Sequence, residues 1–260
     1  SSGYHVIELS SRTGCISNEN TLSDIPKIDF VVHLAGILSV EESWLYPLKY
    51  NLINVNGTTN VLELCRKHGA TMVYCSSYVY GAPAKLPVCE LHEIVPTNPY
   101  TLSKVSAETM CELYHQQYGV KCKIFRPFNI YGPGQSEKLV LGRIFGQLKR
   151  HNKIEIRNVA TKRDFIHVLD IAKFVTSLLD YKSDFDVFNV GSGQSISISE
   201  VITLIQELMD EKVQITQTHK DFHDPIINCF ADISKADEKL NWKPLINIKQ
   251  GLSELLKDIV

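Results

Sequence analysis

The stretch Phe30-Val-Val-His-Leu-Ala-Gly36 decides the fold class of this chain. Its first five residues form an apolar run that is too short for a helix, so we expect a strand that is buried on both faces. Strands of this kind belong to parallel sheets that helices cover on both sides. Three further runs indicate strands in the same sheet, at Tyr4–Leu9, Met72–Cys75 and Lys121–Arg126.

Helical segments lie between these strands. We predict one long helix over Val40–His68, ended by Gly69, and a second over Pro99–Tyr118, with a proline in its first turn. The alternation of strand and helix predicts an α/β fold of the Rossmann type, with a doubly wound parallel sheet. Ligands of such sheets bind beyond the carboxyl ends of the strands.

The alternation loosens after Tyr131, where we predict a smaller C-terminal lobe. Its expected helices are Leu139–Arg150, Val168–Leu179, one that begins after a capping box at Ser197–Glu200, and Lys249–Ile259. We therefore assign residues 1–130 to the sheet domain and 131–260 mainly to the lobe, with 160–192 returning to the sheet domain.

Composition excludes several classes of protein. The 260 residues hold 27 Lys and Arg against 29 Asp and Glu, so no basic excess predicts nucleic acid or an anionic membrane as a partner. The longest apolar stretch, Phe30–Val40, is about half as long as a membrane span. The seven cysteines are odd in number and contain no CxxC, which predicts neither a disulfide framework nor a metal site. We expect a cytoplasmic protein.

Three positions carry the strongest chemical signal. Tyr100 and Lys104 lie four residues apart in a predicted helix, and therefore on one face, while Ser76 and Ser77 follow a predicted strand. A free tyrosine has a pKa of about 10, and a nearby ammonium favours its ionised form. The phenolate could then accept a proton from a substrate hydroxyl that a serine holds in place. The alternative is an exposed helix face beside an ordinary turn.

Five longer motifs accompany these residues: His33-Leu-Ala-Gly36, Asn54-Val-Asn-Gly-Thr58, Ser76-Ser-Tyr-Val-Tyr-Gly81, Asn98-Pro-Tyr-Thr-Leu-Ser-Lys104 and Arg163-Asp-Phe-Ile-His-Val-Leu-Asp170. With them the chain resembles the extended short-chain dehydrogenase/reductases that act on nucleotide sugars, and UDP-galactose 4-epimerases in particular. The resemblance implies that residues 1–130 bind a dinucleotide, NAD or NADP, and that the lobe binds a nucleotide-diphosphate sugar. It also implies a homodimer.

The resemblance assigns roles to individual residues. Tyr100 is the expected base, Lys104 is expected to lower its pKa, and Ser76 is the expected catalytic serine, with Ser77 as second choice. The expected cofactor contacts are Ser10, Arg12, Ala35, Gly36, Asn54, Tyr100, Lys104 and Pro127. The expected substrate contacts are Ser76, Ser77, Asn129 and Arg163.

The chain departs from the family pattern at its start. The GxxGxxG turn is absent, and Tyr4–Leu9 matches the second strand of the family, so we expect that the sequence is a piece of a longer chain. NAD-preferring members carry an acidic residue where Ser10 stands here. Ser10 and Arg12 would suit the 2′-phosphate of NADP, although a solvated loop is an equal alternative.

A further departure narrows the reaction. Dehydratases of this family carry an acidic residue just after the catalytic serine or threonine, where this chain has Ser77 and Tyr78. We therefore predict an NAD(P)-dependent nucleotide-sugar 4-epimerase. The alternative is an NADPH-dependent nucleotide-4-ketosugar reductase. A non-catalytic sensor of the same fold is disfavoured because Ser76, Tyr100 and Lys104 are all present.

Overall fold

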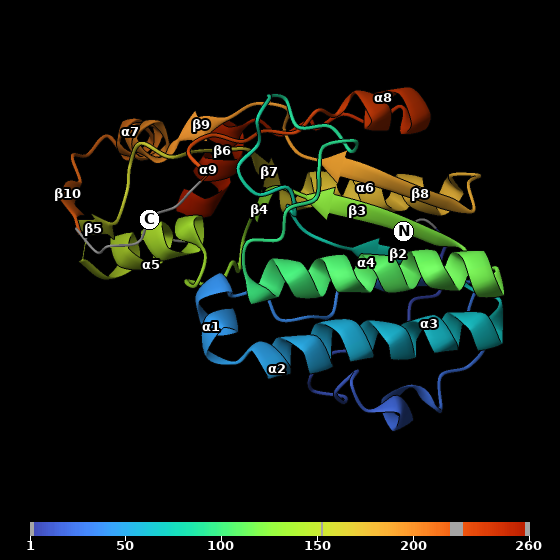
Figure 1. Ribbon diagram of the computed structural model, residues 1–260. Helices are drawn as coiled ribbons and strands as arrows, with labels where there is room; N and C mark the ends of the chain where they lie inside the picture. The colour runs from blue at the N-terminus through green and yellow to red at the C-terminus, as the bar shows by residue number, and fades with distance from the viewer. Residues whose placement is uncertain (1–2, 152, 219–225, 258–260) are drawn as a thin grey trace. The chain divides into compact units, whose positions relative to one another are not determined.

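The computed structural model describes residues 3–151, 153–218 and 226–257 (Figure 1). The chain forms two compact units whose segments alternate along the sequence. The first unit consists of Ser1–Val79, Pro96–Ile124 and Lys182–Asp186, and the second of Tyr80–Val95, Phe125–Tyr181 and Val187–Val260. The prediction of a single main boundary near residue 130 assigned residues 80–95 to the sheet domain, whereas here they belong to the second unit.

Four strands form the main sheet, in the order β1-β2-β3-β8. They are β1 (Phe30–His33), β2 (Thr71–Cys75), β3 (Cys122–Pro127) and β8 (Phe185–Val190). β1 and β2 run parallel, and His33 lies opposite Tyr74. The middle residues of β2 are fully buried, as expected for a strand that is covered on both faces. The predicted α/β fold with a parallel sheet is confirmed.

The segment predicted as one long helix, Val40–His68, is helical but interrupted. The structure has α1 (Val40–Leu45), α2 (Pro47–Tyr50), the π-helical segment η2 (Asn51–Asn56) and α3 (Gly57–His68). The break lies at Tyr46, with φ −132°, because the residue before a proline is disfavoured in the helical region and Pro47 has no N–H to donate. α3 ends at Gly69, whose φ of 68° is the left-handed conformation that glycine adopts readily.

The second long helix, α4 (Pro99–Tyr118), has the predicted bounds. Asn98 and Thr101 form a reciprocal capping box at its start, so the first turn of this helix is fixed in place. α3 and α4 lie side by side (Figure 1), and Tyr114 on α4 donates a hydrogen bond of 2.8 Å to Glu63 on α3.

The predicted strand at Tyr4–Leu9 is also wrong. These residues have no regular secondary structure and are exposed, and Val6 keeps 79% of its surface. A strand is stable only when a neighbouring strand takes its hydrogen bonds, and none in the part of the chain that the structure describes pairs with this segment. The only regular element between it and β1 is the short 3-10 helix η1 (Glu19–Leu22).

The second unit contains the remaining elements. These are β4 (Asn129–Tyr131), α5 (Val140–His151), β5 (Lys153–Ile156), β6 (Lys162–Arg163), β7 (Phe165–His167), α6 (Val168–Asp180), β9 (Ile196–Ser197), α7 (Ile198–Met209), β10 (Gln214–Gln217), α8 (Ser234–Leu240) and α9 (Ile248–Leu256). β4 pairs with β7 and β5 with β10 in parallel, whereas β6 and β9 are antiparallel. The helices predicted near 139–150 and 168–179 and the capping box at Ser197–Glu200 are confirmed. The predicted end of the last helix, Ile259, lies outside the described residues.

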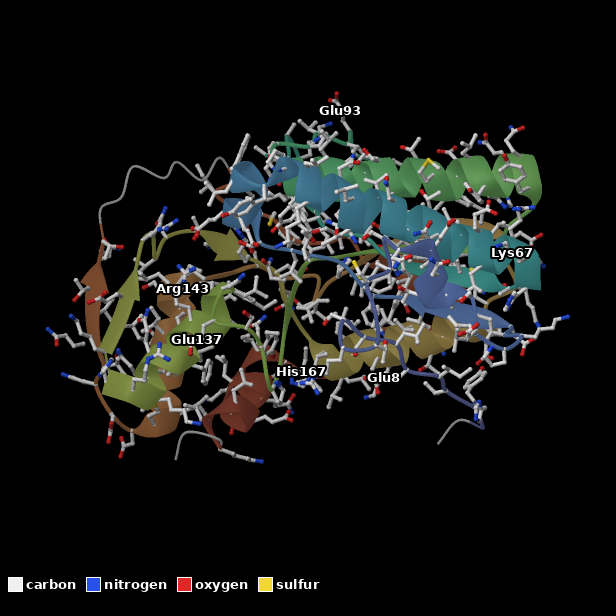
Figure 2. All side chains as sticks on the ribbon, turned by 90° about the horizontal axis from the view of Figure 1, so that it is seen from below. Glu8, Lys67, Glu93, Glu137, Arg143 and His167 are labelled. Carbon is white, nitrogen blue, oxygen red and sulfur yellow. The ribbon has the colours of Figure 1, made fainter. Side chains whose placement is uncertain are left out.

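The core of this unit lies between α5, β5, α7 and α9, where Ile144, Ile154, Val201 and Leu252 are fully buried. Glu137, labelled in Figure 2, lies on the surface of this unit. Its two carboxylate oxygens accept hydrogen bonds of 2.7 Å from Nη1 and Nη2 of Arg150. No helix within residues 3–151, 153–218 and 226–257 is long and apolar enough to cross a membrane.

A single buried carboxylate connects three segments of the second unit. Asp164 Oδ1 accepts the N–H and the hydroxyl of Ser192, at 2.6 and 2.7 Å. Its Oδ2 accepts the N–H groups of Gly193 and Ala231, at 3.1 and 3.0 Å. The backbone oxygen of Asp164 accepts from both the N–H and the side-chain amide of Asn129. The loops at 191–193 and 231 are therefore held by one side chain.

We predict that Asp164→Ala destabilises the protein by at least about 3 kcal/mol, because several buried N–H groups lose their acceptor together. Urea unfolding measures this loss. Asp184→Ala is the control, since that carboxylate pairs with Lys121 at the surface, and its unfolding midpoint should hardly change. Equal midpoints for the two variants would contradict the role of Asp164.

Candidate active site

The first unit brings the predicted catalytic residues together. Ser76 and Ser77 follow the last residue of β2, and Tyr100 and Lys104 occupy the first two turns of α4. Tyr100 is hydrogen-bonded to Ser77. The ammonium of Lys104 donates a bond of 2.6 Å to the backbone oxygen of Cys75, which fixes α4 against the end of β2.

The two serines differ in their surroundings. Ser77 is partly exposed and bonds Tyr100, whereas the hydroxyl of Ser76 is buried and has no hydrogen-bond partner within the described ranges. The two hydroxyls therefore lie in different surroundings. The sequence favoured Ser76 and kept Ser77 as second choice; the hydrogen bond of Tyr100 favours Ser77.

Burial controls the charges at this site. It raises the pKa of Tyr100 to about 12, and the hydrogen bond from Ser77 only partly opposes that shift. Burial also lowers the pKa of Lys104, whose ammonium lies 4.4 Å from the ring centroid of Tyr74. Burial is the largest cause of the raised pKa of Tyr100, and the expected lowering of this pKa by Lys104 stays a prediction.

His33 adds a neutral neighbour to the site. Burial first, and then the nearby Lys104, lower the pKa of this imidazole to about 3. Its Nε2 lies 3.0 Å from the hydroxyl of Thr58, and its ring stacks on Tyr74. These contacts are those of a buried core histidine.

Asn54 links the loop after β1 to α4. Its Oδ1 accepts the N–H of Ile37 at 2.9 Å, and its Nδ2 donates to the oxygen of Ile37 at 3.0 Å and to the hydroxyl of Ser103 at 2.9 Å. Ser103 in turn donates to the backbone oxygen of Tyr100 at 2.7 Å. The sequence pointed to Asn54 but missed Ser103 and Ile37, because nothing in the local pattern predicts partners so distant along the chain.

The residues at the carboxyl ends of β1 and β2 fit a nicotinamide dinucleotide. Ala35 and Gly36 follow β1 with exposed backbone, and the amide of Asn54 lies directly behind them: a Cβ on Gly36 would come within 3.0 Å of Asn54 Oδ1. Backbone groups that are open in this way can approach a pyrophosphate. The polar groups of Tyr100 and Lys104 stand at the end of β2.

The predicted cofactor residues Ser10 and Arg12 are not hydrogen-bonded to these groups in the part of the chain that the structure describes. Ser10 and Arg12 lie in an exposed turn in which the Arg12 N–H donates to the Ser10 hydroxyl at 3.3 Å. Within the described ranges no hydrogen bond joins this turn to Ala35, Gly36 or Tyr100. Pro127, the last residue of β3, belongs to the second unit.

The predicted substrate residues of the second unit lie close to each other. The side-chain amide of Asn129 donates to the backbone oxygen of Asp164 at 3.0 Å, and Asp164 is the residue that follows Arg163 in the chain. Arg163 Nη1 donates to the oxygen of Lys162 at 2.8 Å. The expected contact of Asn129 and Arg163 with the phosphates of a substrate remains a prediction.

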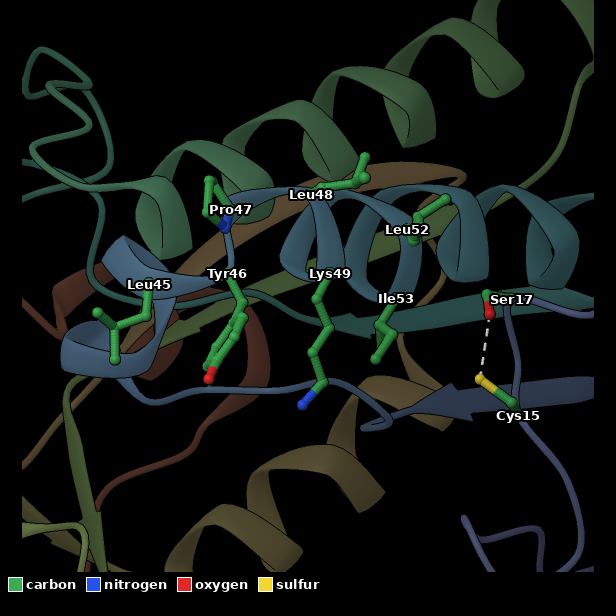
Figure 3. Close-up of a pocket in the computed structure, with 9 residues that line it drawn as sticks. All are labelled: Cys15, Ser17, Leu45, Tyr46, Pro47, Leu48, Lys49, Leu52 and Ile53. Atoms are coloured by element: carbon green, nitrogen blue, oxygen red, sulfur yellow. Dashed lines mark hydrogen bonds between the residues drawn. The ribbon is translucent and has the colours of Figure 1, made fainter.

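A separate open pocket of about 570 Å³ in the first unit is chemically unlike this site. Residues of α1, α2 and η2 line most of this pocket, among them Lys49 and Leu52. Tyr46, Cys15 and Ser17 complete its wall (Figure 3). It contains neither Tyr100 nor Lys104, so we place the candidate active site at the end of β2 instead.

Comparison with known proteins agrees with this geometry. The model of the NAD-dependent epimerase/dehydratase family matches residues 1–191. The chain belongs to this family. The resemblance to the extended short-chain dehydrogenase/reductases is thereby confirmed, and the prediction of an enzyme with a nicotinamide cofactor is confirmed at the level of the family.

Two curated relatives show the range of activities. A putative UDP-glucose 4-epimerase of Methanocaldococcus jannaschii is 34% identical over 88% of this chain and 76% of its own length. A GDP-6-deoxy-D-mannose reductase of Pseudomonas aeruginosa is 33% identical over 88% of this chain and 80% of its own length.

Two solved structures share the fold. RMD from Pseudomonas aeruginosa, complexed with NADPH, has a TM-score of 0.88 at 32% identity and covers 94% of this chain and 86% of its own. UDP-glucose 4-epimerase from Thermotoga maritima, with UDP-glucose, has a TM-score of 0.86 at 26% identity and covers 94% of this chain and 82% of its own.

The contrast between the two serines gives a direct test. We expect Ser77→Ala to lower kcat by about 10²-fold or more, because the hydrogen bond to Tyr100 is lost. Ser76→Ala should stay within about tenfold, and steady-state kinetics on the same nucleotide sugar compares the two. The reverse order would assign the catalytic hydroxyl to Ser76.

The raised pKa of Tyr100 predicts its titration in the protein without cofactor. Tyrosine ionises near 10 in an unfolded chain, so the stability that neutral Tyr100 provides is complete below about pH 10 and is lost as pH rises through 12. Phenolate absorbance in the near ultraviolet is followed against pH in the wild type and in Tyr100→Phe. The difference between the two curves reports Tyr100 and should therefore develop near pH 12. A difference that is complete near pH 10 would show that burial does not control this group.

Proposed function

We propose that this protein is a nucleotide-sugar 4-epimerase that works by transient oxidation at the 4-position of the sugar. The observation that carries the proposal is the hydrogen-bonded pair of Tyr100 and Ser77, one helical turn from Lys104. Relatives named as 4-epimerases, from Methanocaldococcus jannaschii and Thermodesulfobacterium geofontis among others, support it.

The residues of the first unit have distinct tasks in this reaction. NAD or NADP, when bound, supplies the hydride acceptor and then the hydride donor. Ser77 holds the 4-hydroxyl of the sugar, and Tyr100 removes its proton and later returns it. Because burial alone makes Tyr100 a reluctant acid, the ammonium of Lys104 is needed near the phenolate as it forms.

The remaining predicted residues would bind rather than react. The exposed backbone of Ala35 and Gly36 would lie against the pyrophosphate of the cofactor, and Asn54 would hold that loop in place. Asn129 and Arg163 would contact the diphosphate of the sugar nucleotide, since a guanidinium suits two phosphate oxygens at once.

An NADPH-dependent nucleotide-4-ketosugar reductase is the second candidate. Arg12 and Ser10 favour it, because they lie in one exposed turn, and a guanidinium and a hydroxyl suit a 2′-phosphate. The similarity to the GDP-6-deoxy-D-mannose reductase and to RMD complexed with NADPH supports it as well.

Cofactor balance decides between the two candidates. UDP, GDP, CDP and dTDP sugars are first screened by thermal shift, and the ligands found are incubated with the enzyme. We expect interconversion of two sugars without net consumption of NAD(P)H, and a loss of at least about 10²-fold in Tyr100→Phe with binding retained. Stoichiometric consumption of NADPH would establish the reductase instead, and unchanged activity of Tyr100→Phe would exclude both mechanisms.

The proposal also includes the assembly and the location of the protein. Four leucines on α2, η2 and α4 expose between 43% and 70% of their surface: Leu48, Leu52, Leu102 and Leu113. This apolar surface supports a homodimer through these helices, and the mass of the protein in solution tests it.

All seven cysteines are free, and this supports a reducing location such as the cytoplasm.

A further inference from the structure

The segment around Cys89 in the second unit is held firmly on both sides. The N–H of Val88 donates to the backbone oxygen of Phe230 at 2.9 Å. The backbone oxygen of Val88 accepts the N–H of Asp232 at 2.8 Å. The carboxylate of Glu90 accepts the N–H of Asn189 at 2.8 Å. Cys89 therefore has a fixed backbone, and its side chain is partly exposed.

An imidazole lies within hydrogen-bond distance of this thiol. Nδ1 of His92 accepts the backbone N–H of Cys89 at 3.1 Å, so this nitrogen carries no proton. The thiol sulfur lies 3.2 Å from the same nitrogen, which is therefore the acceptor for its S–H. Nε2 lies 3.3 Å from the oxygen of Lys85 and donates to it, and this bond fixes the tautomer.

The ring of His92 is also supported from the side and is partly exposed. It packs edge to face with Tyr80, whose ring centroid is 6.3 Å away. The next residue, Glu93, points outward from the protein (Figure 2). Thiol, base and orienting carbonyl therefore form the arrangement that activates cysteine nucleophiles, at a place that reagents can reach.

We propose that Cys89 and His92 form a reactive thiol site that takes up low-molecular-weight disulfides. Nδ1 of His92 accepts the proton of the thiol and thereby gives up the bond from the N–H of Cys89, and the thiolate attacks one sulfur of the disulfide. The bond between Cys89 and that sulfur forms as the disulfide bond breaks, and the leaving thiolate takes the proton back from His92. The disulfide is the oxidant, since it ends as one free thiol and one mixed disulfide.

The other cysteines lack this arrangement. Cys65, Cys111, Cys122 and Cys229 are buried. The thiol of Cys75 points to the backbone oxygen of Ser76, and burial raises its pKa. Cys15 is exposed, but its partner is the hydroxyl of Ser17, which is no base (Figure 3). Cys15 is therefore the internal reference for Cys89.

The test measures the rate at which each thiol reacts with oxidised glutathione and with iodoacetamide, assigned by peptide mass spectrometry. We expect His92→Asn to slow the reaction of Cys89 by at least about tenfold, while Cys15 in the same molecule keeps its rate. Asparagine retains an acceptor for the N–H of Cys89 but is not a base. His115→Asn is the matched control, and Cys89→Ser confirms the assignment.

A second measurement needs no variant. A thiol that is merely half-buried reacts faster after unfolding, because burial protects it. An activated Cys89 should react faster in the native wild-type protein than in the urea-unfolded one. An unchanged rate of Cys89 in His92→Asn, or slower reaction of Cys89 in the native than in the unfolded protein, would overturn the proposal.

Discussion

The side chain of Asn54 is the connection on which the candidate active site depends. It engages both polar groups of the Ile37 backbone and the hydroxyl of Ser103, and it is almost fully buried. Through Ser103 the same network reaches the backbone of Tyr100. One amide therefore ties the loop after β1 to the helix that carries the predicted base. Buried hydrogen bonds of this kind are costly to leave unmade, so the network favours a single arrangement.

The position of Asn54 within a π-helical turn fits this task. A π-helical turn holds an extra residue, which shifts the side chains that follow around the helix, and such turns are frequent at functional sites. Thr58, one turn later, then meets His33 at the end of β1. The same face of the helix thus contacts both the strand and the loop that follows it.

Burial gives this site its chemical character. Lys104 and Tyr100 are both in surroundings that favour their neutral forms, the lysine by a lowered and the tyrosine by a raised pKa. In the proposed function, proton transfer at Tyr100 would therefore depend on the charge that a bound substrate and cofactor bring close to it. In the second unit fixed backbone serves a different chemistry, because Val88 and Glu90 hold Cys89 where His92 can accept its proton.

The sequence by itself determined the strands β1, β2 and β3, the bounds of α4, the capping box at Ser197–Glu200 and the placing of Tyr100 and Lys104 on one helix face. Each depends on residues a few positions apart, whose spacing in a helix or strand is fixed by geometry. It did not predict the break at Tyr46, before Pro47, or the π-helical turn over Asn51–Asn56. Only the tertiary structure decided that Tyr4–Leu9 is not a strand, that Ser77 rather than Ser76 bonds Tyr100, and that Asn54 binds Ile37 and Ser103. These features depend on partners brought together by packing, and a one-residue step in an extended segment reverses the side to which a side chain points.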